Sequence, residues 1–554
     1  MPQKSMQTDY DIVIIGAGIS GLTAAAIAGK FGLKCCVLEK EPKAGGYLAG
    51  FSKDGFHFDT AIHWLNQCNK NEMAGRIFNM IGADSPKIKN MQKIHRFKGE
   101  TYDYLLTNNP DELKEKLISD FPHEEKGIRK FFLTAKKIGK GSLRYAKLFR
   151  TEESMSVFEK PFFKLKLLRF VLPLVKYVFY SGEKGVPKGL NKFFKDKNLH
   201  KLYSSENDLL SCLFPIAWAY NNGYQITEEG GARVFIQWLT YVNKKLGNDL
   251  ILNAEVTKLE VNNKICESVV YQQKGKENTV KSKYVVSSND IETLYTKMLP
   301  VGAVSPKLKS RLKDAVLYSS AVTVSIAIDC PAEELGIGQE LISVTKEGIK
   351  RNDHDGGDPM ISDISVLSPS ARDKSLTPEG KGLITLYIPA YIDYKNFWQT
   401  EKGKNGEFIR GEKYQKLKTK VAETLIQRVE KELSIDLKNH TLFYDVSTPI
   451  TYYRYTGNKN GTMMGARPGK ANMQAGIAHH QTPVGNLVLG GHWADLGGGV
   501  PICAKAAMNS ILLILKKENK GSFKLLANYM DGKIETNELN GNSLIKDYDN
   551  SWSE

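Results

Sequence analysis

Residues 10–39 read YDIVIIGAGISGLTAAAIAGKFGLKCCVLE, and this stretch decides the fold. The apolar run at 10–15 is rich in β-branched residues, which predicts a buried strand. A glycine-rich turn follows, then a helix of small residues over 19–31, and then a second strand that ends at Glu39. A strand, a helix and a strand in this order predict a parallel sheet of the α/β class.

The turn between the strand and the helix has the spacing G-x-G-x-x-G, with glycines at positions 16, 18 and 21. Gly16 permits the tight turn, Gly18 lets a pyrophosphate approach the main chain, and Gly21 lets the helix pack closely on the sheet. Ile19 and Ser20 open the helix, whose N-terminus stabilises phosphate charge. The turn therefore predicts a Rossmann-type dinucleotide site.

The residues after the second strand favour FAD over NAD. Glu39 stands where an acid accepts hydrogen bonds from the adenosine ribose, and an acid there disfavours a 2′-phosphate. Lys40 follows it, and the pair Gly45-Gly46 lets the chain run beside an extended pyrophosphate and ribitol. A further glycine-rich turn, GGHWADLGGGVP at 490–501, precedes a helix whose dipole is placed to stabilise a reduced flavin.

Length and composition limit the remaining possibilities. A chain of 554 residues is too long for one ordinary core, so we expect two or three domains. The net charge of +16 favours anionic partners, but no nucleic-acid recognition module supports a nucleic-acid role. Seven cysteines without zinc-like spacing predict a reducing compartment and no metal site. The N-terminal MPQKSMQT shows no secretory signal, so we expect a cytoplasmic protein.

Residues 161–180, PFFKLKLLRFVLPLVKYVFY, combine aromatic and aliphatic side chains with lysines and an arginine. The chain has no run of 18 apolar residues, so no spanning helix is expected. The segment suits an amphipathic helix that lies on an anionic bilayer, which predicts peripheral membrane attachment. The alternative is a lid or a core-facing helix with snorkelling lysines.

The order of expected elements predicts a discontinuous FAD-binding domain and an α+β substrate domain with a mixed sheet and a helical cap. Within it, 86–220 are expected to be mostly helical, 353–381 to be a loop, and 408–434 to be a long amphipathic helix. The expected boundaries are 8–85, 221–310 and 481–527 for the FAD-binding domain, 86–220 and 311–480 for the substrate domain, and 528–554 for a loose polar tail.

The motifs GAGISG, VLEK, AGGY, FHFDTAIHW, EEGGA at 228–232, KYVVSSND and GGHWADLGGGVP resemble a known family. This is the phytoene desaturase, carotenoid isomerase and retinol saturase group, within the amine-oxidase-like fold of FAD-dependent enzymes. The resemblance covers both ends and the middle of the chain and hardly touches 90–220. Lys43 and Tyr47 replace the arginines that flank the glycine pair in amine oxidases, and Leu496 replaces a proline, which points away from amine oxidases.

The resemblance implies a role for each matching position. The pyrophosphate would lie at Gly16, Gly18 and Gly21, the ribose at Glu39, the diphosphate and ribitol at Gly45 and Gly46, the adenine at the main chain of Val256, and the ribitol and isoalloxazine at Asp495, Gly498, Gly499, Val500 and Pro501.

The resemblance also implies redox chemistry or isomerisation at carbon–carbon double bonds of a long apolar polyene or isoprenoid, such as a carotenoid or retinoid. His63 is the leading candidate acid or base, unless it only hydrogen-bonds the flavin or a carbonyl group. Trp64, His492 and Trp493 are candidates to flank the flavin or polyene, although a lone tryptophan is more often a core residue. The electron partner (a quinone, oxygen or a reductant) stays open. The alternatives are a flavin amine oxidase for a small polar substrate and a non-catalytic lipid-binding flavoprotein.

Overall fold

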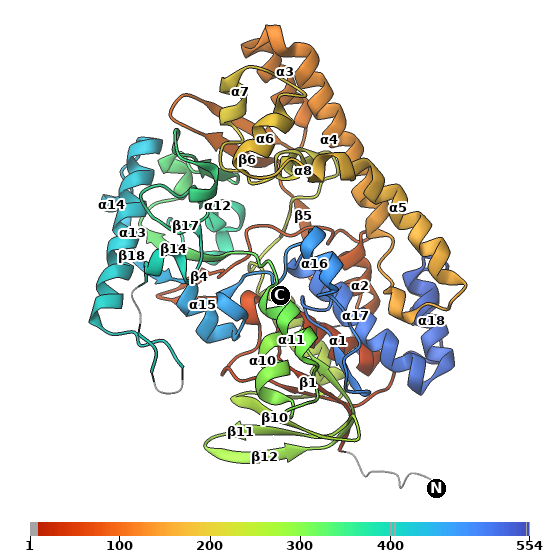
Figure 1. Cartoon of the computed structure of the whole chain (residues 1–554). Coiled ribbons are helices and arrows are strands. Elements are labelled where there is room, and N and C mark those ends of the chain that lie inside the picture. Colours follow the sequence, from red (N-terminus) through yellow and green to blue (C-terminus); the bar gives the residue numbers. More distant parts are fainter. Residues whose placement is uncertain (1–8, 399–400, 404–405, 550, 553–554) are drawn as a thin grey trace, which may run out of the picture.

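The computed structural model describes residues 9–398, 401–403, 406–549 and 551–552. Three regions are visible in Figure 1: a lower part that contains β1 and α1, a sheet with α13 on its outer side, and a helical cap above both. The segment MPQKSMQT lies outside the described residues, so the expectation about a secretory signal is not addressed by the structure.

The first region is a five-stranded sheet in which every neighbouring pair is parallel. Its order is β19-β13-β1-β2-β9, so strands from three distant parts of the chain meet in it. The bounds are β1 Tyr10–Ile15, β2 Cys35–Leu38, β9 Asp249–Ile251, β13 Ser282–Ser287 and β19 Leu487–Leu489. The predicted α/β Rossmann fold and its discontinuity are confirmed.

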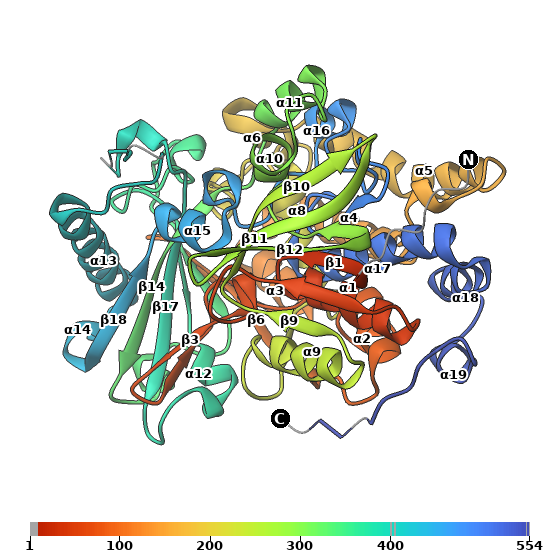
Figure 2. The ribbon, with the colours of Figure 1, turned by 90° about the horizontal axis from the view of Figure 1, so that it is seen from below.

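Helices rich in small residues cover this sheet. α1 (Ile19–Lys30) is buried along its whole length, because alanine and glycine let it approach both the sheet and α17 (Gly499–Glu518). Further helices of this region are α2 Met73–Ile81, α9 Val234–Lys245, α10 Ile291–Thr293, α11 Pro306–Lys313 and α16 Lys470–Ala475. An antiparallel sheet of β10 Ala254–Asn262, β11 Ile265–Gln273 and β12 Lys276–Val280 lies beside them (Figure 2).

The second region is a mixed seven-stranded sheet of order β18-β14-β17-β16-β15-β6-β7, in which only β15 and β6 pair in parallel. Its strands are β6 Lys93–Lys98, β7 Asp103–Thr107, β14 Ser320–Ile328, β15 Leu341–Val344, β16 Ile364–Leu367, β17 Gly382–Ala390 and β18 Thr441–Ser447. The helix expected at 408–434 is α13 (Glu412–Leu433), whose apolar side chains cover one face of this sheet (Figure 2). The expected loop at 353–381 is wrong in part, since it contains β16 and the short helix α12 (Pro369–Arg372).

The third region is the cap, which has its own apolar core. It consists of α3 Pro110–Asp120, α4 Glu125–Ala146, α5 Glu159–Val178, α6 Gly182–Leu190, α7 Lys197–Lys201 and α8 Leu209–Ala219. Residues 86–107 are the exception to the expected helical character, because they form β5 (Ile88–Asn90) and the two strands that complete the mixed sheet. The remaining elements are β3 Phe51–Lys53, β4 Phe56–Phe58, β8 Gln225–Thr227, α14 Leu437–His440, α15 Pro449–Thr456, α18 Lys520–Met530 and α19 Thr536–Asn540.

Two segments near the C-terminus are built into the first region. α17 is the one helix among the described residues that is long and apolar enough to cross a membrane, but 72% of that stretch is buried in the protein. The expectation of a loose tail after residue 528 is wrong. Leu539 of α19 is fully buried and Tyr548 is 9% exposed, and both belong to the core around α1 and α17. The segment after residue 528 is polar in composition, but its few apolar side chains pack into this core.

Candidate functional site

The glycine-rich turn has the geometry that a dinucleotide requires. Gly16 has φ +95°, which disfavours any residue with a side chain, and a Cβ at Gly21 would lie 1.9 Å from the carbonyl oxygen of Gly16. Gly18 differs from both, because its φ is −73° and a Cβ there would meet nothing within 4 Å. Two of the glycines therefore shape the turn, and the third keeps open the space where a pyrophosphate would approach. Ile19 and Ser20 begin α1 and are each 5% exposed.

Glu39 is held beside this turn. Its carboxylate accepts the N–H groups of Ala17 at 2.7 Å and Glu41 at 3.0 Å, and the residue is 8% exposed. Burial raises the pKa of its carboxyl, as expected for an acid that lacks a full partner. The main-chain oxygen of Glu39 accepts the N–H of Ala254, and Val256 follows two residues later on β10. The structure thus brings Glu39 and Val256 to the same end of the sheet.

The second glycine pair runs alongside the turn. Gly45 donates its N–H to Ala17 at 2.9 Å, and a Cβ at Gly46 would lie 3.5 Å from the Cα of Gly18. Lys40 points elsewhere, since its ammonium donates to the carbonyl oxygen of Arg454 at 2.8 Å. The side chain of Lys40 is therefore engaged by another segment of the chain.

The C-terminal glycine turn at 490–501 packs against the start of α1, next to the first glycine turn. Gly497, Gly498 and Gly499 all have positive φ, and a Cβ at Gly498 would lie 2.4 Å from the Cβ of Met464. The hydroxyl of Ser20 donates to the carbonyl oxygen of Gly490, which joins α1 to the turn. Val500 is buried in the first turn of α17, and Pro501 follows it.

Asp495 lies in this turn and forms an ion pair with the nearly buried Lys505 at 2.6 Å. Burial alone would raise the pKa of Asp495, but the Lys505 ammonium more than offsets it and the pKa is lowered. Lys505 is one turn into α17, and its ammonium lies over the ring of Tyr145 at 5.6 Å. A fixed positive charge therefore stands beside the expected ribitol position, which sequence patterns did not reveal.

His63 and Trp64 line a pocket between the first region, the mixed sheet and the cap. Its apolar walls come from three segments and include Ile62, Leu65, Ile226, Leu367 and Leu376. The His63 ring stacks on Tyr387 of β17, with ring centroids 4.1 Å apart and 6° between the planes. Trp64 packs against Tyr224 of the cap at 5.3 Å. Burial and the nearby Arg372 lower the pKa of His63 to about 3, so its imidazole is neutral at pH 7.

One wall of the pocket carries buried charges that the sequence analysis missed. The carboxylate of Asp59 accepts the N–H of Ala232 at 3.2 Å, and that of Asp373 accepts the N–H of Gly231 at 3.1 Å. The guanidinium of Arg372 donates to the carbonyl oxygen of His63. Burial raises the pKa of Asp59 to about 6 and lowers that of Arg372 to about 10. Asp59 belonged to a quoted motif, whereas Arg372 and Asp373 stood in an apparent loop and gave no signal.

The other predicted aromatic pair is placed differently. Trp493 is 3% exposed in an apolar core, which matches the alternative weighed for a lone tryptophan. The His492 ring lies against Gly465, where a Cβ would be 2.5 Å from its Cδ2 atom. Burial lowers the pKa of His492 to about 4, and within the described part of the chain its Nε2 atom makes no hydrogen bond. His492 therefore offers an unused polar atom beside the glycine turn.

The structure also groups three potential metal ligands outside this site. The donor atoms of Asp329, Cys330 and His440 lie within 4.8 Å of one another at the end of β14. The sequence analysis expected no metal, and their spacing in the chain carried no signal. A 2.7 Å hydrogen bond between His440 Nδ1 and Asp329 accounts for this pair without an ion.

Comparison with known proteins agrees with this geometry. The profile of the NAD(P)-binding Rossmann-like domain matches residues 14–81. An all-trans-retinol 13,14-reductase of Danio rerio is 24% identical over 90% of this chain and 86% of its own. A chloroplastic prolycopene isomerase of Daucus carota is 23% identical over 89% and 78%, respectively. A lycopene-forming phytoene desaturase of Pseudescherichia vulneris is 22% identical over 91% and 98%.

Solved structures share the fold. An oxidoreductase from Methanosarcina mazei aligns with a TM-score of 0.56 at 17% identity, covering 90% of this chain and 99% of its own. Cyclohexylamine oxidase from Brevibacterium oxydans aligns with a TM-score of 0.55 at 12% identity, covering 92% and 100%. These likenesses extend over both sheets, and the sequence relatives span nearly the same length. Over most of its length the chain is therefore similar to enzymes of the phytoene desaturase, carotenoid isomerase and retinol saturase group.

Proposed function

We propose that this protein binds FAD and saturates, desaturates or isomerises carbon–carbon double bonds of a long apolar polyene or isoprenoid. The observation that carries the proposal is the apolar pocket that contains His63 and Trp64 and borders the main chain of Gly231 and Ala232. An apolar lining with a few polar groups suits a hydrocarbon chain, which carries no charge and which the site needs only to position. The relatives with printed activities act on such molecules, which supports the same substrate class here.

The residues of the dinucleotide site fit FAD. Gly18 leaves room for a pyrophosphate, Glu39 presents a buried carboxylate for a ribose, and the glycines at 497–499 let α17 begin close to the site. When bound, FAD supplies the hydride chemistry that no side chain provides. The domain boundaries at 85/86, 220/221, 310/311 and 480/481 are part of this proposal, as are the cofactor-binding roles of the residues named above.

His63 is the proposed catalytic side chain. Because burial and Arg372 lower its pKa to about 3, the imidazole is neutral at pH 7 and a weak base, so it can position the substrate through a hydrogen bond but is not charged as an acid. Its stacking on Tyr387 fixes the plane of the ring. Trp64 adds a flat apolar surface along which a polyene can lie. His492 and Trp493 stay candidates on the side of the glycine turn.

The first experiment is a visible spectrum of the purified protein, followed by anaerobic incubation with carotenoids and retinoids. Bleaching of the flavin band or a shift of the polyene maximum supports the proposal and gives the direction of the reaction. A yellow protein that ignores every polyene and consumes oxygen with amines would show the amine oxidase alternative. Flavin that stays oxidised with every reductant and lipid would show the non-catalytic one. Quinones, oxygen and reductants are then tested as electron partners.

We also propose that α5 attaches the protein to the cytoplasmic face of an anionic membrane. The helix runs along the outer edge of the molecule (Figure 1), and only Leu174 of its residues is buried. Its exposed apolar side chains recur every three or four residues, which places them on one face. The stripe consists of Phe162, Leu165, Leu168, Leu172 and Val175, with Phe158 and Phe179 at the two ends of the helix, and Val178 is exposed outside it. Lysines at 160, 164, 166 and 176 and Arg169 flank this apolar stripe.

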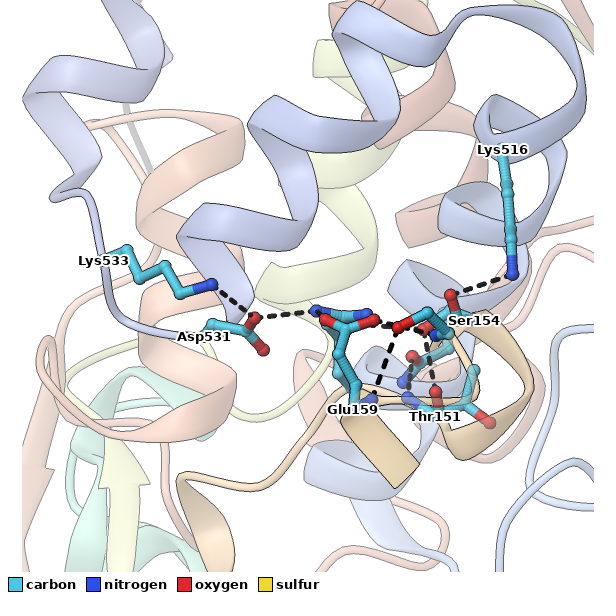
Figure 3. A network of polar contacts seen from close by, with 9 residues as sticks. Thr151, Ser154, Glu159, Lys516, Asp531 and Lys533 are labelled. Carbon is cyan, nitrogen blue, oxygen red and sulfur yellow. Dashed lines mark hydrogen bonds and ion pairs between the residues drawn. The ribbon is translucent and has the colours of Figure 1, made fainter. Parts of the chain in front are cut away.

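Polar contacts join the N-terminal end of α5 to the C-terminal helices. Arg150 is 5% exposed, and its guanidinium lies 3.1 Å from the carboxylate of Glu159 and 2.7 Å from that of Asp531. Lys516 of α17 donates to the carbonyl oxygen of Ser154 at 3.0 Å (Figure 3). The network holds the start of the helix rigidly, so the exposed stripe keeps its orientation relative to the pocket.

Binding to liposomes tests the membrane proposal. Replacing Phe162, Leu172 and Phe179 with serine should lower binding to anionic vesicles more than tenfold, since burying each such side chain contributes about 1.5–3 kcal/mol. A control with Val301, Met360 and Leu442 replaced by serine removes apolar side chains that are equally exposed elsewhere and should bind normally. Equal binding by both triple variants would contradict the proposal.

A further inference from the structure

The two faces of the mixed sheet differ in chemistry. The face under α13 consists of aliphatic side chains such as Val324, Leu386 and Val366. The opposite face carries hydroxyl groups along four neighbouring strands. Thr323, Tyr387, Ser365 and Ser343 stand directly opposite one another in the register, so they share this face. A pocket for a pure hydrocarbon does not require such a surface.

Strand β16 leads along this polar face away from the pocket. Leu367 lines the pocket with His63, Ser365 lies opposite Tyr387, and Asp363 precedes the strand. Side chains two residues apart share a face, and a strand rises about 3.4 Å per residue, so Asp363 lies about 13 Å from Leu367. Asp363 therefore lies on the same face of β16 as Leu367, at the end of the strand that points away from the pocket.

Asp363 belongs to a cluster between the sheet and the cap. Its Oδ1 atom lies 3.5 Å from Nδ1 of the fully buried His354. The guanidinium of Arg351 donates to the carbonyl oxygen of Glu206, and the Asn207 amide donates to the Asp355 carboxylate. The cap segment that follows α7 is thus held against the loop that precedes β16.

Buried polar atoms without a hydrogen-bond partner gather in this cluster. Within the described residues they are Ser204 Oγ, Asn207 Oδ1, Arg351 Nε and His354 Nε2. His354 Nδ1 and Asp363 Oδ1 also lack a well-formed hydrogen bond and lie 3.5 Å from each other. Buried polar atoms in folded proteins nearly always have partners, so a polar ligand or ordered water belongs here. The set contains donors and acceptors together. A hydroxyl group serves both, whereas an ammonium group only donates and a carboxylate only accepts.

The cations near the carboxyl groups of the cluster do not fully compensate for the burial of these groups. Burial raises the pKa of Glu206 to about 8 and that of Asp355 and Asp363 to about 6. Arg351 lowers the pKa of Glu206 and Arg467 lowers that of Asp355, but neither effect is large enough to offset the effect of burial. All three acids nevertheless keep part of their surface accessible. A ligand that brings a hydrogen-bond donor can satisfy them.

We infer that Glu206, Asp355, Asp363 and His354 form a site for the hydroxyl end of an amphipathic polyene or isoprenoid alcohol. The apolar chain of this substrate lies past Tyr387 against His63 and Trp64. The inference rests on the proposed polyene chemistry and specifies its substrate class. A site built to hydrogen-bond a hydroxyl group rejects an analogue that lacks it, because its own polar groups then lose their partner. The parent hydrocarbon should bind at least about 100-fold more weakly.

The test uses the flavin-loaded, full-length protein and four polyenes of one chain length that end in an alcohol, a hydrocarbon, an amine or a carboxylic acid. Quenching of tryptophan fluorescence gives the affinities. The variants Asp363→Asn and Glu206→Gln should each lower alcohol affinity about tenfold or more and leave hydrocarbon affinity within about twofold. The control Asp445→Asn changes an exposed acid on β18 of the same sheet and should change neither. The ratio of the affinity for the alcohol to the affinity for the hydrocarbon, measured within one preparation, does not depend on the fraction of protein that is folded.

The outcomes separate this inference from the proposed function. Turnover of polyenes with equal affinity for alcohol and hydrocarbon would overturn the hydroxyl site and keep the double-bond chemistry. A preference for the amine or the acid would overturn the hydroxyl assignment, and oxidation of the amine itself would overturn the proposed function as well. A yellow protein that binds no polyene would overturn both.

Discussion

The dinucleotide region and the pocket at His63 are built on different principles. Around Gly16, Gly18 and Gly21 the main chain itself forms the site, and its shape is set by contacts within about thirty consecutive residues. The pocket is made of side chains that the fold collects from distant segments, among them His63, Ile226 and Arg372. A site formed by main chain leaves a readable motif, whereas a site formed by collected side chains does not.

The two regions also treat charge differently. Around the glycine turn of the dinucleotide region most buried residues are small and uncharged, and the acid Glu39 is held by main-chain N–H groups. The pocket wall buries Asp59, Arg372 and Asp373 next to apolar side chains. Disturbing the first region should therefore remove a ligand, and disturbing the second should change stability and its pH dependence.

The largest expected effect is on the main-chain site. Gly18→Glu should fold, because a Cβ there meets nothing within 4 Å and φ is ordinary, but it should purify without flavin since a carboxylate would occupy the pyrophosphate position. Gly411→Glu is the matched control: Gly411 also precedes a helix with φ −73°, and its Cβ would likewise meet nothing. The ratio of flavin to protein absorbance is the measurement. A yellow Gly18→Glu protein would contradict the assignment of the site.

A smaller effect is expected at the pocket wall. Arg372→Met removes a cation near Asp59 and Glu340 and leaves Asp59 only Arg233, so it should lower the free energy of unfolding by about 3 kcal/mol at pH 7. Arg454→Met changes an exposed arginine and should stay within about 0.5 kcal/mol of the wild type. Urea denaturation followed by fluorescence compares them. Equal stability of the two variants would show that the wall charges are not coupled.

The smallest effect concerns pH. In the folded protein the pKa of His63 is lowered to about 3, below the ordinary value near 6.5, so the unfolded chain takes up a proton first as pH falls. Stability from this group is present above pH 6.5 and is lost on acidification. Between pH 7 and 5 the loss is about 2 kcal/mol, which His63→Gln should abolish. The measurement is the wild-type-minus-variant difference at both pH values, with the exposed His123→Gln as control. If the difference in stability between wild type and variant were the same at both pH values, the His63 side chain would be in contact with water.

Regular periodicity predicted much of the fold. The parallel strand pattern, the helix over 412–433 and the helical segment at 159–178 followed from local composition. The strand at 364–367 was hidden in a stretch rich in glycine, aspartate and proline, because its partners β15 and β17 are what make it a strand. The C-terminal segment was hidden for a similar reason, since Leu539 and Tyr548 are isolated apolar residues whose burial depends on α1 and α17.

The sequence by itself determined the dinucleotide site and the Rossmann fold, because a glycine turn, a helix and an acid at a fixed spacing act through the main chain. It also determined the apolar and basic character of α5, since a helical period of 3.6 residues sorts side chains without any partner. Only the tertiary structure decided that Asp59, His63 and Arg372 share a pocket and that Tyr387 stacks on His63. It alone decided that Glu206 of the cap faces Asp355 and Asp363 of the sheet region. These contacts join residues hundreds of positions apart, and no local pattern encodes a distance that long.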